Sequence, residues 1–195
     1  TSYTPTFLGL DKPGGLWDQL GGQDKAGEGI IIGIVDGGIW PEQDSFADRV
    51  DGDGTPTRSG STLAYDAPPA SWKGICQVGE GFAATDCNNK LIGARYFKQP
   101  TQTLHWTEFL SARDSVAGAE GHGGHGDHTA STAGGNAHVT ATTNGLSLGK
   151  ITGMAPRARI AAYKVCWTDG VTGANGCATS NSVAAIEQAV KDGVN

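Results

Sequence analysis

The sequence predicts an α/β fold, because apolar runs typical of buried strands are separated by stretches with helical patterns. Residues 29–35 form a short apolar run without alternating polar positions, which is typical of a strand buried on both faces of a parallel sheet. Residues 90–97 and 158–166 are two further strand candidates. Helices between such strands favour parallel pairing and a layered architecture.

Two segments have helical patterns. Residues 128–133 are a run of small residues, which predicts a tightly packed helix. Residues 182–191 predict a second helix, for which we expect Ser180 or Asn181 to cap the start and Gly193 the end. Its larger apolar side chains share one helical face: Val183, Ile186 and Val190.

Residues 1–195 are expected to belong to one domain, since no internal repeat and no linker divides them. Residues 49–70 are polar and rich in glycine, proline, serine and threonine, so we expect an exposed loop insertion there. The second helix ends just before residue 195, and no strand follows it. We therefore expect the sheet to be incomplete at its C-terminal end.

Composition argues against several classes of protein. The net charge is -6 and no basic patch stands out, which argues against a nucleic-acid partner. No apolar run approaches the length of a membrane helix, so we expect no membrane partner. The 31 glycines show no Gly-X-Y period, and they indicate tight turns and close backbone approaches rather than collagen.

Four cysteines form two equally spaced pairs, Cys76 with Cys87 and Cys166 with Cys177. No CxxC spacing is present, which argues against a zinc ribbon. Pairing within each pair is the simplest arrangement, because each disulfide would then close a short loop. Spacing alone leaves the other pairings open, as well as four free thiols in a cytosolic protein.

Two segments carry residues that could perform chemistry. Asp36 ends the first buried strand, and functional groups of α/β sheets gather at the carboxyl ends of strands. The second segment has histidines at every third position among glycines: His122, His125 and His128. These histidines could bind a metal with Asp127, or one of them could be a general base where a helix begins. A flexible loop without a role is the third interpretation.

Both segments resemble motifs of a known family, the subtilases. Residues 124–134, Gly-His-Gly-Asp-His-Thr-Ala-Ser-Thr-Ala-Gly, resemble the histidine motif, and residues 34–42 resemble the aspartate motif. The likeness is closest to the plant-type, cucumisin-like branch. It continues in further segments: residues 4–10, 71–74, 87–97, 113–114, 153–160, 163–167 and 184–194.

The resemblance implies a three-layer subtilisin-like fold with a mainly parallel sheet. It also implies a secreted serine endopeptidase that cleaves proteins or peptides, needs no diffusible cofactor or metal, and matures by loss of an inhibitory propeptide. The serine and the oxyanion asparagine are expected in the remainder of the protease, downstream of residue 195. Together with secretion, the spacing favours the disulfides Cys76–Cys87 and Cys166–Cys177.

The resemblance assigns roles at the site. Asp36 matches the catalytic aspartate and His125 the catalytic base, so the two are expected within hydrogen-bond distance. We expect structural roles for Gly38, Gly126 and His128, with the His128 side chain pointing into the structure. His122 is expected outside this arrangement. Asn136 is not the oxyanion residue, because it is close to His125 in sequence and is expected on the same helix.

Three local features depart from the motifs or stand apart from them. The family has Thr or Ser where this chain has Gly37, so a hydroxyl that could bind the catalytic carboxylate is missing. Asp127 replaces a threonine, and its charge would raise the pKa of His125 if the side chain turned inward. Residues 51–55, Asp-Gly-Asp-Gly-Thr, resemble half of a calcium loop, although a solvated acidic loop is the simpler interpretation.

Two alternative functions stay open on the sequence. A zinc-dependent hydrolase would use the three histidines with Asp36 or Asp127 as ligands. A non-enzymatic pseudo-protease would keep the fold as a binding domain.

Overall fold

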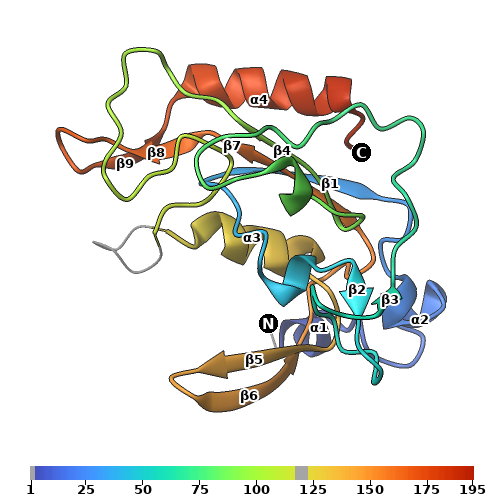
Figure 1. The fold of residues 1–195 in the computed structure, drawn as a ribbon. Helices are drawn as coiled ribbons and strands as arrows, with labels where there is room; N and C mark the ends of the chain where they lie inside the picture. The colour runs from blue at the N-terminus through green and yellow to red at the C-terminus, as the bar shows by residue number, and fades with distance from the viewer. Residues whose placement is uncertain (1–2, 117–122) are drawn as a thin grey trace.

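The computed structural model describes residues 3–116 and 123–195 and contains a three-stranded parallel sheet at its centre (Figure 1). The strands are β1 (Ile31–Asp36), β4 (Leu91–Tyr96) and β7 (Arg159–Lys164), and β7 lies between the other two. Each corresponds to a predicted strand. Because all three run in the same direction, their carboxyl ends meet at one edge of the sheet.

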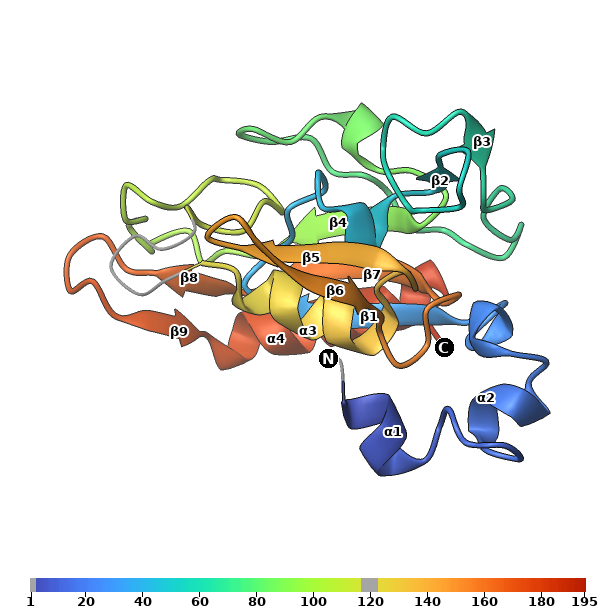
Figure 2. The same ribbon diagram turned by 90° about the horizontal axis from the view of Figure 1, so that it is seen from below.

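Helices cover both faces of this sheet and give the expected three layers (Figure 1). Helix α3 (His125–Gly134) packs on one face and α4 (Thr179–Asp192) on the other. Short helices occur elsewhere: α1 (Thr4–Leu8), α2 (Leu16–Gln19), and the 3-10 turns η1 (Gln23–Lys25), η2 (Asp44–Phe46) and η3 (Ala84–Asp86). Figure 2 shows α1 and α2 to one side of the sheet.

Outside the central sheet, the described residues form three antiparallel pairs of strands, which the sequence patterns do not predict. They are β2 (Arg49–Val50) with β3 (Thr62–Leu63), β5 (Val139–Thr143) with β6 (Leu146–Ile151), and β8 (Cys166–Thr168) with β9 (Asn175–Cys177). The β5–β6 hairpin extends away from the sheet in Figure 1.

Burial on both faces of β7 explains why the strands of this sheet have continuous apolar sequences. Successive side chains of a strand point to opposite faces. Ile160 and Ala162 therefore join the core on the α3 side, while Ala161 and Tyr163 join the core on the α4 side. A strand covered on both faces has no polar position to interrupt its pattern.

The α4 prediction is correct in position, and the cap at its start differs from the expected one. The residue that caps its start is Ala178, without a side-chain hydrogen bond, rather than Ser180 or Asn181. Gly193 ends the helix in the left-handed conformation, as predicted. The side chains that face the sheet are Asn181, Ala185, Ala189 and Asp192, whereas Val183, Ile186 and Val190 are exposed. Alanines allow a closer approach to the sheet than larger apolar side chains would, so size selects the buried face here.

The segment 49–70 is exposed only in part. Residues 51–54 and 61–63 are exposed, as expected. Tyr65 is buried, however, and its hydroxyl donates a hydrogen bond to the carbonyl oxygen of Pro156 at 2.8 Å. An aromatic side chain with a satisfied hydroxyl anchors the end of this loop to the body of the fold.

Both cysteine pairs are disulfides, Cys76–Cys87 and Cys166–Cys177, which confirms the local pairing. The second disulfide joins β8 to β9 directly, since these two residues are partners in that ladder. Among the described residues, no helix is both long and apolar enough to cross a membrane.

A buried ionic contact joins α4 to the sheet and gives the first testable prediction. Asp192 accepts two hydrogen bonds from the guanidinium of Arg95, at 2.7 and 2.8 Å, and one from the hydroxyl of Tyr163 at 2.9 Å. Asp192→Ala would leave the Arg95 charge without its partner. The free energy of unfolding of the full-length protein should therefore fall by about 3–5 kcal/mol. Urea denaturation measures this, with exposed Lys191→Ala as the control. A loss no larger than that of the control would contradict the role of this contact.

Candidate active site

Asp36 is the last residue of β1, so its carboxylate lies at the carboxyl edge of the sheet. The ladder with β7 continues past it, because the Val165 amide donates to the Asp36 carbonyl oxygen at 2.9 Å. The backbone is thereby fixed, and the carboxylate points toward α3. It accepts hydrogen bonds from the Gly37 amide at 2.6 Å and from His125.

His125 is the first residue of α3, and its Nδ1 lies 2.8 and 3.0 Å from the two carboxylate oxygens of Asp36. A carboxylate only accepts hydrogen bonds, so Nδ1 is the donor and Nε2 carries the free lone pair. The His125 side chain is 77% exposed, against 14% for Asp36. The Asp36–His125 dyad therefore has one half-buried and one accessible member.

The Asp36 carboxylate raises the pKa of His125 above its ordinary value of 6.5. The hydrogen bond from Nδ1 is the main cause, the Asp36 charge is the next, and partial burial acts in the opposite direction. A carboxylate in this position stabilises the imidazolium ion. The pair can accept a proton at Nε2 and hold the resulting charge.

Two glycines, Gly126 and Gly38, lie where the start of α3 meets the loop after β1. A Cβ atom at Gly126 would overlap the carbonyl oxygen of Gly38. Gly38 itself has φ +120°, and a Cβ atom there would lie 2.7 Å from the Asp114 amide nitrogen. Gly126 is therefore needed for backbone contact between the segments that carry Asp36 and His125, and Gly38 is needed where the loop after β1 packs against residues 112–114.

A pocket of about 290 Å³ opens beside the dyad. It extends from Asp36 and His125 to the disulfide that joins β8 and β9. Its lining residues are Val35, Asp36, Gly37, Glu108, Asp114, Ser115, Gly123, His125, Cys166, Asn175 and Cys177. A reactant in this pocket would lie next to the exposed imidazole.

The comparison with known proteins decides the family. The profile described as "Subtilase family" matches residues 27–195. The chain belongs to the subtilase family. It is 41% identical over 195 residues to Subtilisin-like protease SBT1.4 of Arabidopsis thaliana, and 42% identical over 204 residues to Subtilisin-like protease SBT1.2 of the same plant. Both relatives support the resemblance to the plant-type branch.

These alignments cover 100% of this chain and 22% of each relative. The chain therefore spans about a fifth of the length of the subtilases that it matches.

In this subtilase, Thr129 also contacts the Asp36 carboxylate, although the sequence motifs predicted no role for it. Its hydroxyl lies 3.1 Å from Asp36 Oδ2. Thr129 follows His125 by four residues on the same helix, so both side chains reach the same point. The spacing of four residues between His125 and Thr129 is the feature of the sequence from which this contact could have been predicted. Together with the Gly37 amide, Thr129 supplies a hydrogen bond of the kind that the missing hydroxyl at position 37 would make.

Asp127 does not contact His125, because its side chain turns toward the loop after β1. Its Oδ1 accepts a hydrogen bond from the Trp40 amide at 2.8 Å. Besides Asp36, the carboxylate that raises the pKa of His125 is Asp114. The expected effect of Asp127 on His125 depended on an inward orientation, and the structure shows another one.

His128 is exposed, so the expectation that it points into the structure is wrong. Helix α3 buries Gly126, Ala130 and Gly134, one residue per turn. Position 128 is about half a turn away from that row, and its side chain faces solvent.

Within the described part of the chain, the structure does not support a metal site. His122 lies outside the described residues. Over residues 3–116 and 123–195, no three histidine, cysteine or acidic side chains are grouped as a metal site would require. In the acidic loop, Asp51 Oδ1 accepts hydrogen bonds from the amides of Asp53 and Thr55 at 3.2 and 3.0 Å, so one carboxylate oxygen closes the turn itself.

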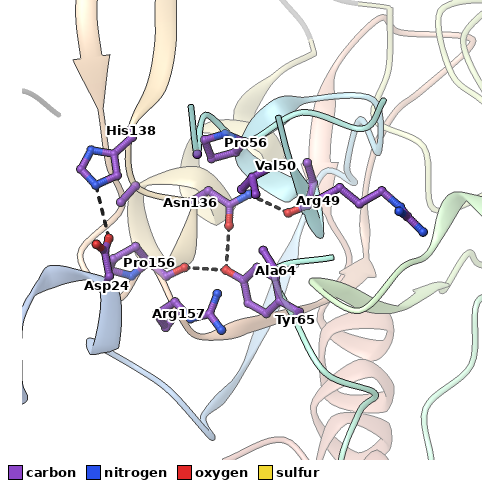
Figure 3. Close-up of a pocket in the computed structure, with 13 residues that line it drawn as sticks. Asp24, Arg49, Val50, Pro56, Ala64, Tyr65, Asn136, His138, Pro156 and Arg157 are labelled. Carbon is purple, nitrogen blue, oxygen red and sulfur yellow. Dashed lines mark hydrogen bonds and ion pairs between the residues drawn. The ribbon is translucent and has the colours of Figure 1, made fainter. Parts of the chain in front are cut away.

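Asn136 has a structural role away from the dyad, and Figure 3 shows it in a separate pocket. It follows the end of α3 rather than lying on that helix, which corrects the expected position. Its Oδ1 accepts a hydrogen bond from Tyr65, and its Nδ2 donates to the carbonyl oxygens of Asp44 and Ala47. With these partners the amide has no donor left for an oxyanion.

The glycine contact gives a prediction with a built-in control. Gly126→Ala should push α3 away from Gly38, separate His125 from Asp36 and return the pKa of His125 toward 6.5. Gly37→Ala should change little, since its Cβ would only touch Asp114 Oδ1 at 3.5 Å. NMR titration of histidine in the full-length variants measures both. Equal His125 titrations in the two variants would refute this packing argument.

Proposed function

We propose that this chain supplies the aspartate and histidine of a serine endopeptidase. The observation that carries the proposal is the hydrogen bond between His125 Nδ1 and Asp36, which leaves Nε2 free at the mouth of a pocket. Membership of the subtilase family supports the same reaction class. The nucleophilic serine and the oxyanion asparagine are assigned to the downstream remainder of the protease, so residues 1–195 alone should be inactive.

The reaction follows from the state of the imidazole. His125 Nε2 removes the proton from the serine hydroxyl while the serine oxygen attacks the carbonyl carbon of the peptide bond. The imidazolium then gives this proton to the leaving amine, and an acyl-enzyme forms. Water, deprotonated by the same Nε2, attacks the acyl-enzyme, and the imidazolium then returns this proton to the serine oxygen as the bond to the acyl group breaks and the acid product leaves. Asp36 keeps its charge throughout and stabilises the imidazolium.

We propose protein or peptide substrates, which membership of the subtilase family and a pocket open beside the imidazole both support. Two disulfides support the proposal that the protein is secreted, since such bonds persist in oxidising compartments. We also propose that an inhibitory propeptide precedes maturation, on the likeness of residues 4–10 to the start of mature subtilases. The proposal assigns no metal to the reaction, so a zinc chelator should leave the activity unchanged.

The roles of the two residues are tested by substitution in the full-length protein. His125→Ala should lower kcat by roughly 10⁵- to 10⁶-fold and Asp36→Asn by roughly 10⁴-fold, on the scale known for serine proteases with this triad. In Asp36→Asn, the acidic limb of the kcat/KM profile should move to lower pH, because the group that raises the pKa of His125 has lost its charge. Steady-state peptidase assays across pH measure both effects.

His138→Ala is the control, because this exposed histidine pairs with Asp24 in the pocket of Figure 3 rather than with Asp36. A zinc hydrolase would lose activity with the chelator. A pseudo-protease would show no peptidase activity in the unmodified protein. Either result would contradict the proposal.

A further inference from the structure

A second polar contact joins the two segments that carry the dyad. Asp127 lies in the first turn of α3, two residues after His125. Trp40 lies four residues after Asp36. The bond from the Trp40 amide to Asp127 Oδ1, at 2.8 Å, therefore connects the same helix and the same loop as the His125–Asp36 bond.

The loop has little freedom to move independently of this contact. Ile39, also in this loop, is bonded to the segment of residues 112–114. Its amide donates to the Ala112 carbonyl oxygen at 3.0 Å, and its carbonyl oxygen accepts from the Asp114 amide at 3.2 Å. Gly126 packs against the Gly38 backbone without room for a Cβ atom. A change at the Asp127 bond is therefore transmitted to the relative position of α3 and β1.

Charged groups surround Asp127 from several segments. Glu42 follows the loop, Arg113 and Asp114 precede α3, and all three influence the Asp127 carboxylate. Arg113 is already engaged, with two hydrogen bonds to Glu42 at 3.0 and 2.6 Å and its guanidinium 4.6 Å from the Trp40 ring. Within residues 3–116 and 123–195, the charges that act on Asp127 are thus two carboxylates and the Arg113 guanidinium, which is shared with Glu42.

We infer that Asp127 is a positioning residue, whose hydrogen bond to Trp40 aligns His125 with Asp36 and whose gain or loss of a proton adjusts that alignment. The inference rests on the proposed function and names a pH-dependent regulation of the same site. An ionised carboxylate accepts a markedly stronger hydrogen bond than a neutral one. The alignment should therefore be tightest when Asp127 is ionised.

Ionisation of Asp127 falls in a useful pH range. Burial raises its pKa to about 7, the Asp114 and Glu42 charges act in the same direction, and the Trp40 amide and Arg113 oppose them. Because the folded-state pKa is raised, the neutral form stabilises the fold at acidic pH, and this contribution is lost as the pH rises through about 7. At high pH, the closer alignment of His125 with Asp36 is thus accompanied by a smaller contribution of Asp127 to the stability of the fold.

The test compares the full-length protein with Asp127→Asn, which keeps an acceptor oxygen and cannot ionise. The ratio of wild-type kcat to variant kcat should be near one at pH 6 and should rise several-fold by pH 8, with KM unchanged. Asp48→Asn is the matched control, because Asp48 also accepts a backbone amide bond, from Asn89 at 2.9 Å, outside the dyad pocket. For Asp48→Asn, the ratio of wild-type kcat to variant kcat should not change with pH. A purely structural role for Asp127 predicts a flat ratio as well, and that result would overturn the inference.

A readout without catalysis separates this inference from the proposed function. NMR titration of His125 should give a lower pKa in Asp127→Ala than in the wild type, because a misplaced Asp36 stabilises the imidazolium less. Should the protein prove inactive, the proposed function fails, and this titration alone decides the role of Asp127. An unchanged His125 titration would overturn it.

Discussion

The dyad depends on how closely the first turn of α3 approaches the loop that follows β1. Backbone contacts backbone at Gly126 and Gly38, and neither position has space for a side chain. This backbone contact sets how closely α3 approaches the loop after β1. Within this packing, His125 Nδ1 lies 2.8 Å from Asp36 Oδ1, so the proposed base is already oriented in the absence of a substrate.

Buried charges hold the remaining wall of the pocket at the same edge of the sheet. Lys164 ends β7, and its ammonium donates to Glu108 Oε2 and to the Arg113 carbonyl oxygen, both at 2.7 Å. Glu108 also accepts the Thr168 amide from β8. Such a pair is costly to desolvate and is retained only where its geometry is well satisfied. Here it attaches the segment with Asp114 to the strands that end at the pocket.

The sequence was informative where one physical requirement dominates a segment. Burial on both faces makes β1, β4 and β7 continuous apolar runs, and a motif with its glycines predicts that Asp36 and His125 meet. Orientation was harder to predict. His128 is exposed, and α4 buries alanines rather than its valines, because the facing surface selects the side of a helix. Thr129 and Asp127 acquire contacts only when β1 and α3 are assembled.

The central claim is that His125 Nε2 serves a serine elsewhere in the protein. The most direct measurement is a crystal structure of the full-length protein after reaction with a serine-directed phosphonate, with the modified residue located by mass spectrometry. We expect one modified serine downstream of residue 195, whose Oγ lies within about 3 Å of His125 Nε2. Modification of a residue remote from His125, or of none, would contradict it.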